Sequence, residues 1–167
     1  TTNGCLAAAQ KALEEGKATD EAIFNNTIDS LNRRYSIMSE VAKYLVDMFP
    51  DKGNIMTQCF GETIVGTMLR EAKIRNKDIK VFVPETRPYF QGSRLTASVA
   101  QDQGFDTIVI TDNMPAYTMT KHKIDLFTSA ADAICLDGHV VNKVGTYQIA
   151  IVAKYHEVPY FVTGIPD

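Results

Sequence analysis

The sequence has no long apolar run, few cysteines and little net charge, and each of these absences excludes a class of protein. No apolar run approaches the roughly 20 residues that a membrane-spanning helix needs. A net charge of −3 indicates no basic surface for nucleic acid or for an anionic membrane. The three cysteines lack metal-ligand spacing, so we expect free thiols, no metal site and a reducing, cytoplasmic location. They are Cys5, Cys59 and Cys135.

The chain also lacks the glycine-rich signatures of nucleotide sites. Its ten glycines form neither the GxxxxGK[ST] of a P-loop nor the GxGxxG of a dinucleotide-binding turn. The three histidines have no metal-ligand spacing either. A generic nucleotide-binding domain is therefore disfavoured.

The apolar pattern is helical up to residue 49 and alternates between strand and helix from residue 54 onward. Predicted strands lie at 54–58, 80–83, 107–111, 126–129 and 160–163, and predicted helices at 62–75, from 91, from 114 and at 144–156. Continuous apolar strands predict an α/β fold with a Rossmann-like parallel sheet and helices on both faces. We expect a helical segment at 1–52 and a catalytic α/β domain at 53–167, which is incomplete at its C-terminal end and part of a longer or cleaved polypeptide.

Polar residues follow each predicted strand, at the end where parallel sheets bind ligands. Cys59 follows the first strand and Asp132 lies just past the fourth. The second and third strands are followed by 85–87 and 112–113, and residues 142–146 open the last helix. These groups are expected to converge on one edge of the sheet.

Each of the two reactive side chains has a functional and a structural interpretation. A thiol at a strand end that faces a helix N-terminus has a lowered pKa, so Cys59 is a candidate nucleophile or proton carrier. The alternative is a buried structural cysteine. Asp132 lies among small and apolar residues, so it is paired, forms an Asx-turn, or is catalytic with a raised pKa.

The start of the last predicted helix has the composition of an anion cradle. Lys143 supplies a charge, Gly145 permits close backbone approach, and the Thr146 hydroxyl can complete the site. The alternative is an ordinary helix start capped by Asn142. Two further cations are either phosphate contacts or surface charges: Arg87 and Arg94.

Five segments resemble the methylthioribose-1-phosphate isomerase family, whose fold is shared with regulatory subunits of the translation-initiation guanine-nucleotide exchange factor. The segments are ETRPYFQGSRLTA at 85–97, ITDNM at 110–114, AAD at 130–132, DG at 137–138 and NKVGTY at 142–147. Their order and spacing agree together. The resemblance implies a homodimer and an aldose-1-phosphate to ketose-1-phosphate isomerisation that needs no cofactor.

The resemblance also implies roles for particular residues. The family's catalytic cysteine and the aspartate of its GAD-like motif correspond to Cys59 and Asp132. Gln91, Asn142 and Lys143 correspond to residues that line the sugar-phosphate pocket. Arginines that grip the phosphate in the family come partly from an N-terminal region with no counterpart here, which agrees with the expectation of a partial chain.

Departures from the family pattern bear on the substrate. The usual His-Cys-Asn is replaced by residues 58–60, Gln-Cys-Phe, and Ala130 and Ala133 stand in place of a glycine and an arginine. The substrate is expected to be methylthioribose-1-phosphate or an analogue such as 5-deoxyribose-1-phosphate or ribose-1,5-bisphosphate. The alternative is a non-catalytic regulatory subunit, which has no need to keep both Cys59 and Asp132.

Overall fold

The computed structural model describes residues 2–164 of the chain, and for residues 62 and 63 the backbone alone. The chain forms two compact units, Thr1–Met38 and Ser39–Asp167. The functional division after residue 52 stays a prediction. No helix in the described part is long and apolar enough to cross a membrane.

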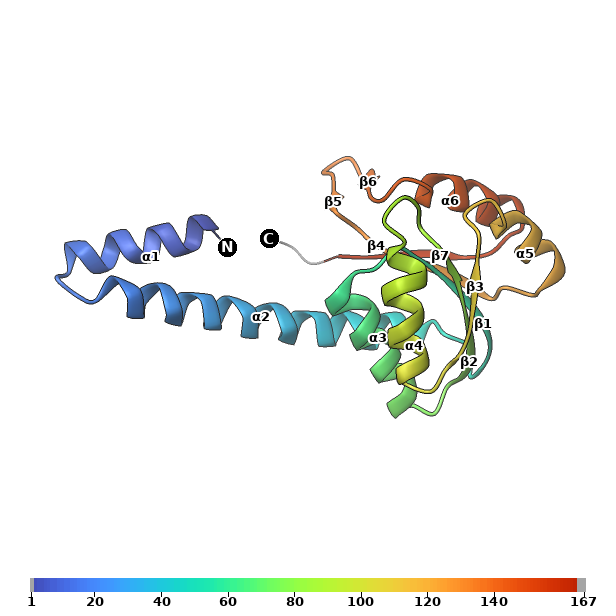
Figure 1. Ribbon diagram of the computed structural model, residues 1–167, viewed down its shortest axis with the longest axis horizontal. Helices are drawn as coiled ribbons and strands as arrows, with labels where there is room; N and C mark the ends of the chain where they lie inside the picture. Colours follow the sequence, from blue (N-terminus) through green and yellow to red (C-terminus); the bar gives the residue numbers. More distant parts are fainter. Residues whose placement is uncertain (1, 165–167) are drawn as a thin grey trace. The chain divides into compact units, whose positions relative to one another are not determined.

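The first unit is a pair of helices. Helix α1 (Thr2–Glu14) and helix α2 (Thr19–Asp47), which belongs to this unit as far as Met38, are joined by a short turn, as the sequence predicts (Figure 1). The two helices contact each other where the Cys5 thiol lies 3.4 Å from the Thr27 hydroxyl and Ala12 is buried. Apolar residues that follow the helical period on this part of α2 are exposed rather than buried: Ile23, Ile28, Leu31 and Tyr35.

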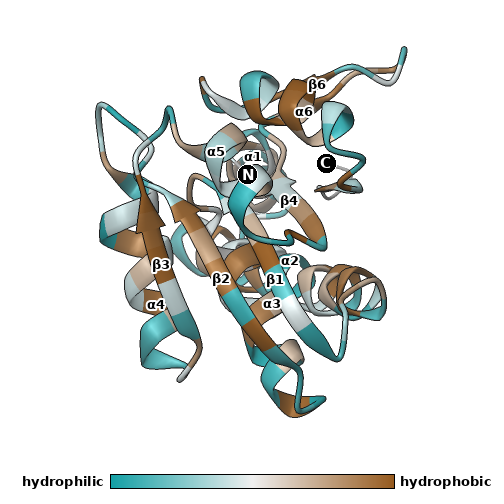
Figure 2. Cartoon of the chain, turned by 90° about the vertical axis from the view of Figure 1, so that its right-hand side faces the viewer, coloured by the Kyte–Doolittle hydropathy of each residue, from teal (hydrophilic) through white to brown (hydrophobic). Residues whose placement is uncertain are grey.

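The second unit is built on a five-stranded parallel sheet in the order β3-β2-β1-β4-β7. The strands are β1 (Lys52–Gln58), β2 (Asp78–Pro84), β3 (Asp106–Ile110), β4 (Leu126–Ala130) and β7 (Tyr160–Thr163). All five were predicted, because buried parallel strands appear in a sequence as continuous apolar runs. Brown segments of β2 and β3 mark such runs in Figure 2.

Helices cover both faces of the sheet, which confirms the predicted α/β fold. They are α3 (Glu62–Ile74), α4 (Ala97–Asp102), α5 (Pro115–Lys121) and α6 (Thr146–Tyr155). Alternate residues of the central strands enter opposite cores, so Ile55 packs with Leu69 while Met56 packs with Phe127 and Ile149. The last turn of α2 and the residues just after it join the first of these cores through residues 45, 46 and 49.

The chain order creates a switch point in the sheet. From β1 the chain proceeds outward to β2 and β3, then returns to place β4 on the other side of β1. The connections therefore diverge between β1 and β4, and this is where open α/β sheets leave a crevice at their carboxyl edge. Cys59 and Asp132 follow these two strands.

Three local features differ from the sequence prediction. The helix expected from residue 91 begins with a π-helical turn, Gly92–Thr96, before α4. The helix expected at residue 144 begins at Thr146, because Gly145 adopts φ 101° and breaks the regular backbone. A small antiparallel hairpin, β5 (Ala133–Ile134) and β6 (Val140–Val141), was not predicted. Its strands are too short to show a period in the sequence.

Candidate active site

Cys59 lies directly after β1, beside the switch point. Its backbone has φ 63°, so the chain turns sharply as it leaves the strand. The Cys59 N–H donates to the Thr86 hydroxyl at 3.3 Å, and the Thr96 hydroxyl donates to the Cys59 carbonyl oxygen. Two threonines from the segment after β2 therefore hold both backbone polar groups of the cysteine.

The pKa of the Cys59 thiol is raised, mainly because the half-buried side chain is withdrawn from water. The Phe60 backbone N–H and the charge of Lys143 lower it, and the charge of Asp132 raises it further. The expectation of a lowered pKa was therefore wrong, since burial outweighs the Phe60 N–H and the charge of Lys143. Lys143 and Asp132 both lie within electrostatic reach of the thiol, as the sequence predicted for this edge.

Asp132 lies at the base of the β5–β6 hairpin. Its N–H donates to the Val141 carbonyl oxygen at 2.9 Å, and the preceding Ala131 N–H donates to the Thr163 carbonyl oxygen at 3.0 Å. The side chain is exposed to solvent, so the small and apolar neighbours of Asp132 in the sequence do not bury its carboxylate. The hairpin itself is apolar and exposed, with Leu136 fully accessible at its tip.

Lys143 contacts another of the predicted substrate-binding residues, Gln91. With the Gln91 amide oriented to satisfy both of its groups, Oε1 accepts from Lys143 Nζ at 3.2 Å and Nε2 donates to the Thr86 carbonyl oxygen at 3.3 Å. Lys143 Nζ also lies 4.7 Å from the centre of the Tyr89 ring, which is a cation–π distance. The ammonium group is thereby fixed close to Cys59.

The start of α6 is not the ordinary capped helix considered as an alternative. Gly145 occupies the cap position, where no side chain caps the helix, and Asn142 Nδ2 donates to the Thr146 hydroxyl at 3.3 Å. A side chain at Gly145 would lie 3.1 Å from Gln58 Nε2, so the turn packs closely against the end of β1. This geometry is compatible with the predicted anion cradle.

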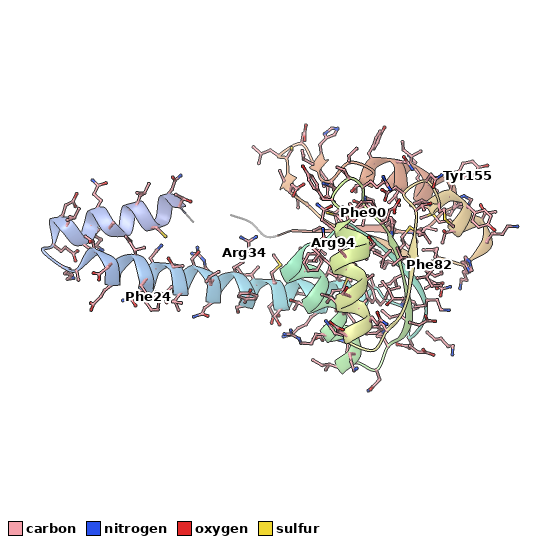
Figure 3. The ribbon with its side chains drawn as sticks, in the orientation of Figure 1. Phe24, Arg34, Phe82, Phe90, Arg94 and Tyr155 are labelled. Carbon is pink, nitrogen blue, oxygen red and sulfur yellow. The ribbon has the colours of Figure 1, made fainter. Side chains whose placement is uncertain are left out.

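The two candidate phosphate arginines lie apart from the other predicted site residues in the described contacts. Arg87 Nε lies 3.3 Å from a Glu85 carboxylate oxygen, and its guanidinium is 4.7 Å from the centre of the Phe90 ring. Arg94 is exposed on the helical turn that precedes α4, close to Phe90 (Figure 3). Neither arginine has a contact that would assign it to a ligand.

Gln58 is a site residue to which the sequence gave no role. It is 2 % exposed, and its Nε2 donates to the Val144 carbonyl oxygen at 3.4 Å. Its Oε1 atom is buried without a hydrogen-bond partner in the described structure. A buried amide oxygen of this kind needs a donor from water or from a ligand. The sequence signals were a polar residue at the end of an apolar strand and the replacement of the family's histidine at this position.

Comparison with known proteins agrees with this architecture. Residues 2–164 match the initiation factor 2 subunit family. The chain belongs to this family. Methylthioribose-1-phosphate isomerase of Sulfurihydrogenibium sp. (strain YO3AOP1) is 41% identical over 137 residues, which are 78% of this chain and 40% of that protein.

Two solved structures of the same fold have different names. The 5-methylthioribose 1-phosphate isomerase of Pyrococcus horikoshii OT3 has a TM-score of 0.80 and 27% identity. The match covers 95% of this chain and 48% of the isomerase chain. The delta subunit of translation initiation factor eIF-2B from A. fulgidus has a TM-score of 0.77 and 29% identity, and the match covers 96% of this chain and 48% of the subunit. The chain thus spans less than half the length of these relatives, and the resemblance seen in the sequence is confirmed.

Proposed function

We propose that the protein is an aldose-1-phosphate to ketose-1-phosphate isomerase and that this chain supplies its catalytic pair, Cys59 and Asp132. One observation carries the proposal. At the switch point of the sheet, the charges of Lys143 and Asp132 both act on the Cys59 thiol. The relatives named as methylthioribose-1-phosphate isomerases support the same reaction class.

The proposed chemistry follows from the substrate. A phosphate on C1 prevents the sugar ring from opening by the free-hemiacetal route, so the ring oxygen must be protonated as its bond to C1 breaks. Asp132 donates this proton. In an enediol route, Cys59 takes the proton from C2 and returns it to C1. In a hydride-shift route, hydrogen moves directly from C2 to C1 and Cys59 takes the C2 hydroxyl proton. In both routes the last proton restores Asp132.

The exposure of Asp132 sets a requirement for this chemistry. A general acid acts best where water does not compete for the proton, and the Asp132 side chain is exposed. Bound substrate, together with the hairpin at whose base Asp132 lies, is proposed to exclude water from the carboxyl group during the reaction. The raised pKa of Cys59 makes it a stronger base but lowers the fraction of thiolate, so turnover is expected to increase with pH.

The surrounding polar groups are proposed to hold the sugar phosphate. Gln91, Asn142 and Lys143 contact the hydroxyl groups, and the start of α6 with Gly145 and Thr146 binds the phosphate. The unpartnered Oε1 of Gln58 accepts from a sugar hydroxyl or an ordered water at the same place. Arg87 and Arg94 stay weaker candidates for the phosphate.

The experiment is an isomerase assay of the full-length protein, with phosphorus NMR to distinguish aldose 1-phosphate from ketose 1-phosphate. Substrates are methylthioribose-1-phosphate, 5-deoxyribose-1-phosphate and ribose-1,5-bisphosphate. We expect the first to be converted, and Cys59→Ser and Asp132→Asn each to lose turnover. Cys135→Ser is the control, since Cys135 is an exposed thiol. Full turnover by both catalytic variants would refute the proposed pair, and no turnover of any sugar by the parent protein would favour a regulatory subunit.

We also propose that the protein is a homodimer that pairs through α6. Tyr147, Ile151 and Tyr155 are 79%, 52% and 83% exposed and recur every four residues on one face of this helix. This Tyr-Ile-Tyr spacing is self-complementary about Ile151 when two copies cross antiparallel. Tyrosine side chains bury about 150–250 Å² each, so Tyr147 and Tyr155 alone can supply about half of the roughly 800 Å² per partner of a standard interface.

The dimer is tested by sedimentation of the full-length protein. Ile151→Asp is expected to give monomers, because it places a charge at the proposed two-fold axis. Ile74→Asp is the control, since Ile74 is a similarly exposed isoleucine on α3. A dimer that survives Ile151→Asp unchanged would place the contact elsewhere.

The free thiols of the described cysteines fit the proposed cytoplasmic location.

A further inference from the structure

We propose that Asp112 is a positioning residue that acts through Thr86 to hold Cys59 and Gln91 in their places at the site. The proposal rests on the isomerase site described above, although its main test needs no substrate. Asp112 lies two residues beyond the end of β3. It is not near Cys59 in the sequence, and the contact depends on β2 and β3 being neighbours in the sheet.

The Asp112 carboxylate grips the backbone that follows β2. Oδ1 accepts from the Thr86 N–H at 2.8 Å, and Oδ2 accepts from the Arg87 N–H at 2.7 Å. Both are charge-assisted hydrogen bonds of short length, which are stronger than neutral ones. The Asp112 backbone carbonyl oxygen accepts from Gln148 Nε2 at 3.1 Å, so the backbone of Asp112 is tied to α6.

The two hydrogen bonds that Asp112 accepts hold Thr86 in a strained backbone conformation. Its φ is 61°, in a region that β-branched residues rarely occupy. A conformation of this kind costs of order 1–3 kcal/mol and persists only where the surroundings enforce it. Without the two acceptor oxygens, the turn would be free to relax toward an ordinary backbone geometry.

The Thr86 turn is connected directly to both site residues. The buried Thr86 hydroxyl donates to the Pro84 carbonyl oxygen at 3.1 Å and accepts from the Cys59 N–H at 3.3 Å. The Thr86 carbonyl oxygen accepts from Gln91 Nε2, and Gln91 Oε1 in turn meets Lys143 Nζ. Relaxation of the turn therefore moves the Cys59 backbone and the Gln91 amide.

The main test is the pH profile of Cys59 alkylation by iodoacetamide in the full-length protein, with mass spectrometry to separate Cys59 from the other cysteines. Asp112→Asn keeps the shape of the side chain but turns one acceptor into a donor. Loosening the turn admits water to the thiol, so alkylation of Cys59 near neutral pH is expected to rise about threefold or more. The charges facing the thiol, Lys143 and Asp132, are unchanged in this variant.

Asp125→Asn is the matched control. Asp125 Oδ2 accepts from the Asn54 N–H at 2.9 Å, so it also holds a neighbouring backbone, but at the amino end of β1. Loss of this hydrogen bond in Asp125→Asn is expected to lower the melting temperature without changing the alkylation of Cys59. Thr86→Val, which removes the hydroxyl but keeps the branched shape, is expected to reproduce the Asp112→Asn alkylation profile.

Turnover gives a second measurement. Asp112→Asn is expected to lower kcat about tenfold to a hundredfold with a smaller change in KM, because a misplacement of about 1 Å has this effect on a reaction. Alkylation profiles of Asp112→Asn and Thr86→Val that match the parent protein would overturn the proposal. If those profiles change while no sugar phosphate is converted, the positioning role holds and the proposed isomerase function fails.

Discussion

Gly92 is the position where a single methyl group is expected to have the largest effect on both stability and the site. A Cβ atom built there would lie 1.8 Å from the Pro84 carbonyl oxygen and 2.8 Å from the Thr86 hydroxyl oxygen. Carbon and oxygen atoms in contact are normally about 3.3–3.6 Å apart, so the overlap with a backbone atom is roughly 1.5 Å. Pro84 cannot yield easily, because it lies at the end of β2 and pairs with Ile110.

The helical turn that begins at Gly92 must therefore move instead. Overpacking of a buried site costs about 1–3 kcal/mol, and the clash with backbone places Gly92→Ala at or above the upper end of that range. Gln91 precedes the moved residue, so its contacts with Thr86 and Lys143 are expected to be lost. A displacement of about 1 Å also predicts a loss of up to a hundredfold in turnover.

Urea unfolding and the isomerase assay measure the two effects. Gly66→Ala is the control, since a Cβ at Gly66 meets nothing within 4 Å and lies inside α3. Alanine is a better helix former than glycine, so this variant is expected to gain about 0.5–1 kcal/mol in stability. If Gly92→Ala unfolds at the same urea concentration as the parent protein, then Gly92 does not lie as close to Pro84 and Thr86 as the structure places it.

Three further predictions concern titration and hydrogen bonding. Lys143→Met removes a charge that lowers the pKa of Cys59, so alkylation of Cys59 near neutral pH is expected to slow. Asp132→Asn removes a charge that raises this pKa, so alkylation is expected to become faster. Alkylation rates measured against pH test both variants. Burial raises the pKa of Cys59 in the folded protein above its ordinary 9.0. The stability that depends on the neutral thiol is therefore complete below pH 9.0 and is lost as the pH rises through the pKa of the folded state. Urea unfolding at alkaline pH is expected to show a smaller loss of stability in Cys59→Ala than in the parent protein. Tyr160→Phe removes the 2.7 Å hydrogen bond with Ser129 and is expected to cost about 0.5–1.5 kcal/mol in the same unfolding assay.

The strands and their order along the chain could be predicted because burial on both faces leaves continuous apolar runs. The convergence of Cys59, Asp132 and Lys143 could also be predicted, since the carboxyl ends of parallel strands share one edge. The β5–β6 hairpin could not, because two-residue exposed strands have no apolar period. The raised pKa of Cys59 depends on which side chains exclude water from it, and the sequence does not contain that information.

The link between Asp112 and Thr86 shows a further limit of the sequence. Both residues were recognised as lying after strands, but their contact requires that β2 and β3 be neighbours in register. A strand period shows which face a residue occupies and says nothing of which strand lies beside it. Long-range polar contacts of this kind are therefore the last part of a site to be predicted.

The positive-φ residues of the described chain bear on the choice between an enzyme and a regulatory subunit. Non-glycine residues with this geometry are Cys59, Asn76, Thr86, Phe90 and Glu157. Two of them follow the ends of α3 and α6, where a left-handed residue commonly terminates a helix.

The other three lie at the candidate site or on the turn that holds it. Cys59 is the proposed base, Thr86 binds its N–H, and Phe90 precedes Gln91. At about 1–3 kcal/mol each, such conformations are retained where placement of a group matters more than stability. A parallel sheet needs none of them to close its core, since the strands end before each of these residues. The strain is therefore concentrated on the positions that acid–base chemistry requires to be fixed, which supports an enzyme rather than an assembly subunit of the same fold.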